Sequence, residues 1–288
     1  MPAIVSGISV GLLYGLLGFS IVTLYKASAT LSFAQPAVGM FTTFLAYYCY
    51  SKLSLPAVAA AVLGLVVAAA LGVVLYLVAM RPNDQAGTAN RSFRTLALYS
   101  LLLAIATTWF ANGQPFQFPI PTPKGSVSVG GSAIPLLSFV TLAVAVVLCS
   151  AILAFFRWTR YGLLFRAVAD DREVARLLGI RARRITALVW VAGTVIACIV
   201  GLLTVPTAFV STDTLSNYAI YALAGVFLGG LTAWTGAFVG GLIIGVVSNV
   251  ALVYVSQEAA LGIVFVILLA VLTVRPRGIL GDEAVTRV

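Results

Sequence analysis

The residues best suited to chemistry stand together in one short stretch of an otherwise apolar chain. The acids Asp170, Asp171 and Glu173 lie within a cluster of eight arginines: Arg157, Arg160, Arg166, Arg172, Arg176, Arg181, Arg183 and Arg184. The chain has no histidine, and its three cysteines show no Cys-X-X-Cys spacing. A zinc site, a histidine base or a Ser-His-Asp triad therefore lacks its usual residues. We expect no catalytic residue, metal or cofactor, and interpret the cluster as a surface that touches something else.

Within this cluster, residues 170–179 have the pattern of a short amphipathic helix. Asp170 is the expected N-cap, with Glu173 three residues later as in a capping box. Val174, Leu177 and Leu178 follow at spacings of three and four and form an apolar stripe. Gly179 is placed to end the helix. Two to three turns are too short to be stable alone, so the helix needs a surface to pack on.

Two surfaces suit such a helix. Its arginines favour an interfacial helix that lies on anionic lipid. Its apolar end, Leu177-Leu178-Gly179-Ile180, favours a docking helix that inserts into a groove of a soluble partner. The residues alone leave both interpretations open.

The rest of the chain is built for lipid. Of its 288 residues 61% are hydrophobic and only 9% are charged, and the mean hydropathy is +1.11, whereas soluble domains carry roughly a quarter charged residues. The apolar runs predict an all-α, polytopic membrane protein of about nine spans (8–10), near 4–25, 34–51, 56–80, 95–112, 135–156, 185–206, 215–230, 236–256 and 259–274. We expect one transmembrane domain over 1–288, with a cytoplasmic loop over 157–184. Glycines spaced by three and four are expected to pack helices closely.

The basic residues predict the orientation of these spans. With the N-terminus outside and nine spans, 15 of the 17 lysines and arginines, from Lys26 to Arg287, fall on the cytoplasmic side with the C-terminus; only Lys52 and Lys124 fall outside. This agrees with the positive-inside rule. The net charge of +9 therefore reports membrane orientation rather than binding to nucleic acid.

Polar residues inside the spans are candidates for a substrate pathway, because such groups usually face the interior of a helix bundle. Gln35, Thr108, Thr194 and Asn249 rank highest, since each lies in an otherwise apolar run. The second span begins with a polar, proline-broken stretch from Ser28 to Pro36, which suggests a half-helix that lines a cavity. The alternative is that these groups bond to neighbouring helices, or that the hydroxyls bond back to their own.

Six short motifs, in order along essentially the whole chain, resemble the permeases of bacterial branched-chain amino acid ABC transporters. They are Gly11 to Leu17, Phe33-Ala34, Arg81-Pro82, Arg166 to Asp171 with Ala175 and Leu178-Gly179-Ile180, Leu228 to Gly230 with Gly236-Ala237 and Gly240-Gly241, and Pro276 with Gly278 to Gly281. The chain departs from the family at Gln35 and Pro36, where such permeases have histidine and glycine.

The resemblance implies a permease subunit in the bacterial inner membrane that moves a small polar organic solute, such as a branched-chain amino acid. ATP hydrolysis would be done by two cytoplasmic ATP-binding subunits, since this chain has no Gly-Lys-Ser/Thr phosphate loop. The other implied partners are a second homologous permease, an extracytoplasmic substrate-binding protein and membrane lipid. Helix 170–179 would be the coupling helix, with Asp170, Asp171, Glu173, Ala175, Leu177, Leu178, Gly179 and Ile180 at the ATPase contact.

Two other classes of function compete with this one. A secondary carrier without ATPase partners is the main alternative, although no charge lies in the middle of a span where such carriers often place a carboxylate. An intramembrane enzyme would need a reactive group of residues, and neither a histidine nor a pair of intramembrane acids is present.

Overall fold

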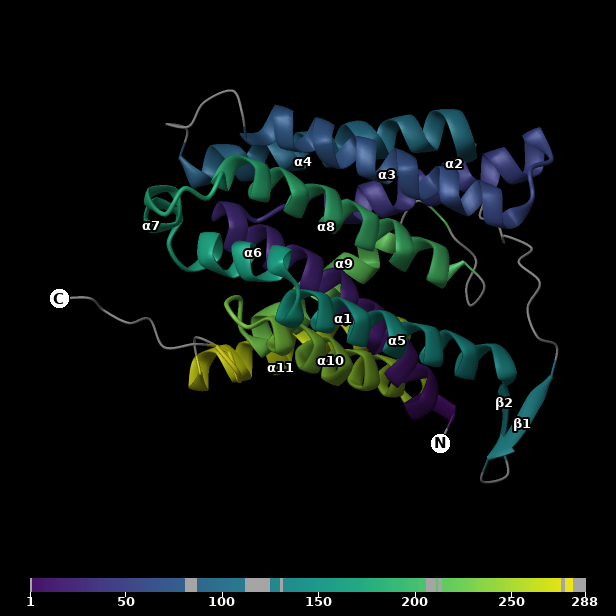
Figure 1. Cartoon of the computed structure of the whole chain (residues 1–288). Coiled ribbons are helices and arrows are strands. Elements are labelled where there is room, and N and C mark those ends of the chain that lie inside the picture. Colours follow the sequence, from purple (N-terminus) through teal and green to yellow (C-terminus); the bar gives the residue numbers. More distant parts are fainter. Residues whose placement is uncertain are drawn as a thin grey trace. The chain divides into compact units, whose positions relative to one another are not determined.

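The computed structural model describes residues 2–80, 87–111, 125–129, 132–205, 211, 214–275 and 278–281. These residues are almost entirely helical (Figure 1). The elements are α1 Pro2–Ser28, α2 Gln35–Leu53, α3 Ala57–Met80, α4 Thr88–Ala106, the π-helical η1 Thr107–Ala111, β1 Ser126–Val129, β2 Ser132–Pro135, α5 Leu136–Trp158, α6 Arg160–Asp170, α7 Arg172–Leu177, α8 Ala182–Thr204, α9 Thr214–Gly229, α10 Trp234–Tyr254 and α11 Gln257–Val274. The predicted helical class is confirmed, with a small antiparallel hairpin of β1 and β2 added to it.

Each of the nine predicted spans coincides with a helix. In the described part of the chain, α1, α3, α5, α8 and α10 are long and apolar enough to cross a membrane, while α9 and residues 259–274 of α11 are apolar but shorter. The count of nine crossings and the sidedness of the termini remain predictions. Arg81, Pro82, Lys124, Pro276, Arg277 and Arg287, on which parts of the sequence argument rest, lie outside the described residues.

The packing of the chain divides it into two compact units. Unit 1 comprises residues 1–22, 124–145 and 219–288, and unit 2 comprises 23–123 and 146–218. The division does not test the expectation of a single transmembrane domain over 1–288, which stays a prediction.

In unit 2, α8 packs against both α2 and α3, and Figure 1 shows α3, α4 and α8 side by side. Glycines allow the close approach: a Cβ added at Gly39 would lie 2.5 Å from the carbonyl oxygen of Ala197, and one at Gly72 would lie 2.7 Å from the Cα of Val191. The buried core around α2 includes Met40, Phe44, Ala46, Cys49, Ala60, Ala106, Val205 and Leu215.

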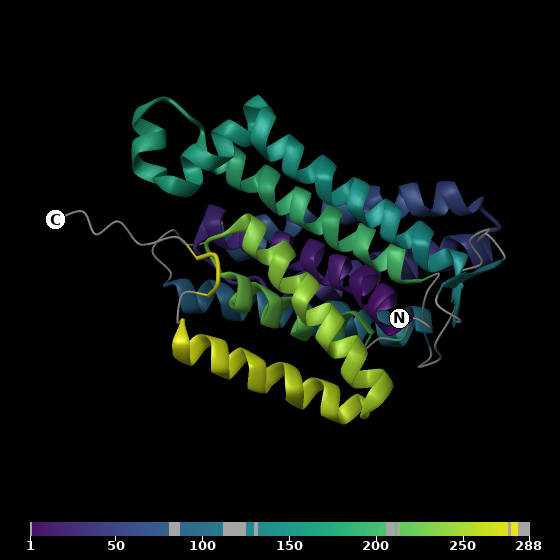
Figure 2. The same cartoon turned by 90° about the horizontal axis from the view of Figure 1, so that it is seen from below.

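In unit 1, glycines form the contact between α1 and α10. A Cβ added at Gly11 would lie 2.9 Å from the Cα of Leu242, and one at Gly241 would lie 2.5 Å from the backbone nitrogen of Gly15. Gly225 and Gly240 bring α9 and α10 equally close. The spacing of these glycines therefore marks helix packing, as expected. Figure 2 shows α11 running back beside α10 after a short turn.

Candidate functional site

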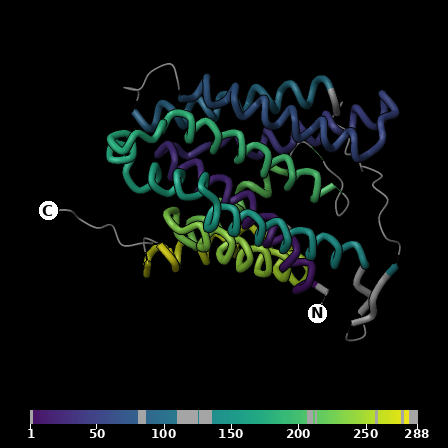
Figure 3. Tube along the Cα trace, viewed as in Figure 1, coloured from purple at the N-terminus to yellow at the C-terminus, as the bar shows by residue number. Residues whose placement is uncertain are grey.

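The predicted coupling region is a pair of short helices between α5 and α8, which Figure 3 shows as a compact turn of the trace. The first, α6, was not predicted from the sequence. Thr159 caps it by accepting a hydrogen bond from the backbone nitrogen of Gly162 at 3.1 Å. Phe165 of α6 packs edge-on against Phe156 of α5, with ring centroids 5.2 Å apart. This contact anchors the turn to the end of α5.

The start of the second helix corrects the sequence prediction. Asp171, and not Asp170, is the N-cap of α7: its Oδ1 accepts hydrogen bonds from the backbone nitrogens of Glu173 (2.9 Å) and Val174 (3.0 Å). Asp170 is instead the last residue of α6, and the backbone is extended at Asp171 between the two helices. The helix predicted over 170–179 is therefore the six-residue α7 with its caps.

The end of α7 is formed as predicted. The backbone nitrogen of Gly179 donates to the carbonyl of Arg176, and that of Ile180 donates to the carbonyl of Ala175, both at 3.0 Å. These two bonds form a Schellman motif, which requires a left-handed residue at the position of Gly179. Its φ is +81°, a conformation that glycine adopts without strain.

The two faces of α7 differ in burial. Ala175 is buried against the fold, with 1% of its surface exposed, whereas Val174, Leu177 and Leu178 are 46%, 87% and 74% exposed. Burying a leucine side chain stabilises a complex by about 1.5–3 kcal/mol. The apolar stripe is therefore an uncovered surface in this chain, and Ala175 orients it outward.

The pathway candidate Gln35 begins α2 and is fully buried. The irregular segment before it is also buried and polar, with Ser28, Thr30 and Ser32 at most 4% exposed. The segment is held to α4, because the backbone nitrogen of Phe33 donates to Thr95 Oγ1 at 3.1 Å. The predicted break in the second span thus places polar groups inside unit 2.

The other pathway candidates have different surroundings. Thr194 is buried in α8, which packs on α2, and its hydroxyl donates to the carbonyl of Val191 at 2.8 Å. Thr108 is an exposed residue of η1, and its hydroxyl donates to Ala104 at 2.8 Å. Asn249 belongs to unit 1, where its Oδ1 accepts from Ser6 Oγ at 3.2 Å. Gln35 and Thr194 lie on α2 and α8, which pack together, and η1, which carries Thr108, also contacts α2.

Two buried hydrogen-bond donors were not among the leading pathway candidates from the sequence. Ser32 Oγ and Trp190 Nε1 are buried and make no hydrogen bond within the described part of unit 2. Ser32 stood among several polar residues of its segment, and a tryptophan in an apolar run gives no signal apart from packing. Trp190 lies one turn before Thr194 on the same face of α8. Unbonded buried donors are rare, and each requires an explanation such as a ligand.

The comparisons with known proteins agree over nearly the whole chain. The family model described as the permease component of the branched-chain amino acid transport system matches residues 3–272. The high-affinity branched-chain amino acid transport system permease protein LivH of Salmonella typhimurium is 29% identical over 301 residues, covering 98% of this chain and 96% of LivH. LivH of Escherichia coli K12 gives the same values. The corresponding BraD of Pseudomonas aeruginosa is 26% identical over 303 residues, covering 100% and 98%.

A solved structure shows the same fold at low sequence identity. PsaBC from Streptococcus pneumoniae in complex with Fab superposes with a TM-score of 0.51 and 13% identity, covering 96% of this chain and 91% of the other. The named relatives LivH and BraD are permease proteins of transport systems. With its membrane-length helices and a family match across residues 3–272, this multi-pass protein of the bacterial cell membrane belongs to the branched-chain amino acid permease family.

Proposed function

We propose that this chain is the permease subunit of an ABC importer for a branched-chain amino acid or a related small polar solute. Two ATP-binding subunits, a second homologous permease and an extracytoplasmic binding protein complete the assembly. The family supports the transport role. The observation that carries the coupling role is α7, a helix capped at both ends that leaves Leu177 87% exposed and Leu178 74% exposed.

In this proposal α7 is the element through which the ATP-binding subunits act. Six helical residues are too few to hold their shape without caps, and here Asp171 and the Schellman turn at Gly179 supply both ends. The docking surface comprises Val174, Leu177 and Leu178, with Ala175 packed underneath. Asp170, Glu173 and Ile180 flank this surface. ATP-driven closure of the partner subunits would move α7 together with α6, which Phe165 ties to α5, and so alternate access to the pathway.

The pathway is proposed to pass the buried polar segment from Ser28 to Gln35. Ser32 Oγ and Trp190 Nε1 are donors with no bond in the described chain, and a polar solute would supply acceptors for them. Gln35, Thr108 and Thr194 all belong to unit 2, whereas Asn249 belongs to unit 1. Because Gln35 carries an amide, it remains neutral and can both donate and accept.

The coupling role is tested with the double variant Leu177→Ala/Leu178→Ala in the chain co-expressed with its partner subunits. A tagged permease is purified in mild detergent, and the ATP-binding subunits that are retained are quantified. We expect their retention to fall at least tenfold, because two leucines leave the contact. The matched control is Leu252→Ala/Val253→Ala on α10, which removes a similar exposed apolar pair (48% and 59% exposed).

The control should retain the ATP-binding subunits as the parent chain does. Equal retention in both variants and the parent would refute docking through α7, and would favour the interpretation in which this helix lies on lipid. Transport that persists without any ATP-binding subunit, and that collapses with an ion gradient, would instead establish the secondary carrier.

A further inference from the structure

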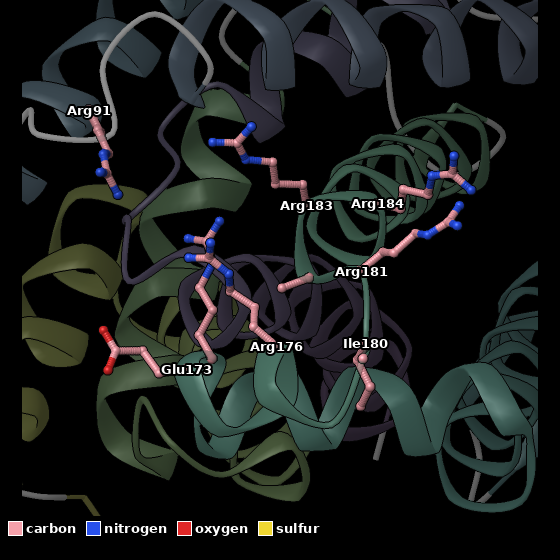
Figure 4. Close-up of a pocket in the computed structure, with 10 residues that line it drawn as sticks. Arg91, Glu173, Arg176, Ile180, Arg181, Arg183 and Arg184 are labelled. Atoms are coloured by element: carbon pink, nitrogen blue, oxygen red, sulfur yellow. The ribbon is translucent and has the colours of Figure 1, made fainter.

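Six arginines from two separate parts of unit 2 line one cavity of about 760 Å³, which Figure 4 shows in close-up. Arg91 comes from α4, Arg172 and Arg176 come from α7, and the others, Arg181, Arg183 and Arg184, come from the connection to α8 and its first turn. Glu173 is the single acid among the residues that line this cavity. Figure 4 shows its carboxylate pointing away from Arg176. Six positive charges against one leave a formal excess of five.

The cavity uses the face of α7 that the proposed docking surface leaves unused. Arg172 and Arg176 are four residues apart and therefore project from the same side of the helix. Figure 4 shows the guanidinium of Arg176 directed toward the side of the cavity where Arg183 lies. Within the described chain no ion pair joins Arg172, Arg176, Arg181 or Arg184 to an acid. Like charges gathered in this way repel one another, and a bound anion would relieve the repulsion.

A second cavity of about 450 Å³ continues the first and is partly apolar. The two share Arg91, Arg172, Arg183 and Arg184, and the second adds residues of α3 and α8: Tyr76, Leu77, Met80, Thr186 and Ala187. Tyr76 joins these helices by donating a hydrogen bond to the carbonyl of Arg183 at 3.1 Å. Beyond Leu77, the outer face of α3 exposes Val73 (45%) and Val74 (49%). A strongly basic cavity thus adjoins an apolar helix surface.

We propose that this arginine cavity binds the phosphate of an anionic phospholipid. Guanidinium groups match phosphate oxygens with paired hydrogen bonds and remain charged at all physiological pH values. Basic cavities at the cytoplasmic end of membrane helices are suited to anionic headgroups. The adjoining apolar face of α3 gives an acyl chain a place to lie, which a free phosphate would not use. The site adjoins the proposed docking surface, since Glu173 and Ile180 line the cavity, but the exposed Leu177 and Leu178 do not.

The test is native mass spectrometry of the full-length chain in a neutral detergent, titrated separately with cardiolipin, phosphatidylglycerol, phosphatidylcholine and pyrophosphate. The site variant is Arg183→Gln/Arg184→Gln. The matched control is Arg157→Gln/Arg160→Gln, which removes the same charge from exposed residues of the same region that do not line the cavity. We expect the site variant to bind cardiolipin about 30-fold more weakly than the parent and the control to bind it as the parent does.

The arms separate the sources of the phosphate. The lipid site is supported if the parent chain binds cardiolipin and phosphatidylglycerol much more tightly than phosphatidylcholine, and if only Arg183→Gln/Arg184→Gln weakens this binding. If pyrophosphate binding depends on the same arginines and the chain shows no preference among the lipids, the occupant is a soluble phosphate and the lipid proposal is overturned. Equal lipid binding by both variants and the parent would overturn the anion site altogether. None of these results depends on transport or on the ATP-binding subunits, so they stand apart from the test of coupling.

Discussion

Replacing Gly179 with alanine should loosen α7 without any steric clash. Gly179 has a φ of +81°, and a Cβ added there meets no atom within 4 Å. The cost is therefore the left-handed conformation alone, about 1–2 kcal/mol for a residue with a Cβ. A free-energy change of this size raises the opening constant of the capped turn by about 5–30-fold. The Schellman bonds from Gly179 to Arg176 and from Ile180 to Ala175 report on this opening.

Hydrogen exchange measured by mass spectrometry on the peptide over residues 170–184 gives the opening constant directly. Gly262→Ala is the control, because Gly262 lies in α11 with no atom within 4 Å of an added Cβ and without a positive φ. Its exchange in 170–184 should equal that of the parent. If Gly179→Ala exchanged at the parental rate, the left-handed turn would not be what holds the end of α7. In the assembled transporter, the same variant should reduce the substrate moved per ATP.

Two further predictions concern the helix packing and the pathway. Gly245→Ala should lower the free energy of unfolding in detergent by about 1–3 kcal/mol, because the added Cβ would fall on backbone atoms of Gly11 that cannot move aside. Gly262→Ala is again the control. Equal stability of the two variants would show that the close contact of Gly245 with Gly11 does not limit the packing. Gln35→Ala should change the rate of leucine uptake into proteoliposomes while the ATP-binding subunits still co-purify, and loss of those subunits would show that this buried amide serves packing instead.

The helices that cross long apolar stretches were predictable because their length and hydropathy decide them. The prediction of 56–80 became Ala57–Met80, and that of 135–156 became Leu136–Trp158. Gly179 was also predictable, since a glycine after an amphipathic stretch is a common helix end. Local signals of this kind need no knowledge of the fold.

The parts that were missed depend on neighbours. With two adjacent aspartates, sequence alone could not decide which one caps α7, because the answer depends on how far α6 extends before it. That helix carries Arg160 and Arg166, so its residues resembled a charged loop. The meeting of Arg91 with Arg183 and Arg184 in one cavity joins segments about ninety residues apart, and no local pattern predicts such a contact. The unbonded donor of Trp190 likewise becomes visible only in the packed bundle.

The glycine contact between α1 and α10 has a consequence for how unit 1 can move. Main-chain atoms meet main-chain atoms at Gly11, Gly15, Gly241 and Gly245, and the glycines themselves have no side chain that could change rotamer. The glycines of this contact lose no side-chain entropy when it forms, and their close approach leaves no room for a side chain between the two backbones. We therefore expect α1 and α10 to move together as one rigid body. A conformational change in unit 1 would then move both helices as a whole, and the chain would bend at other places.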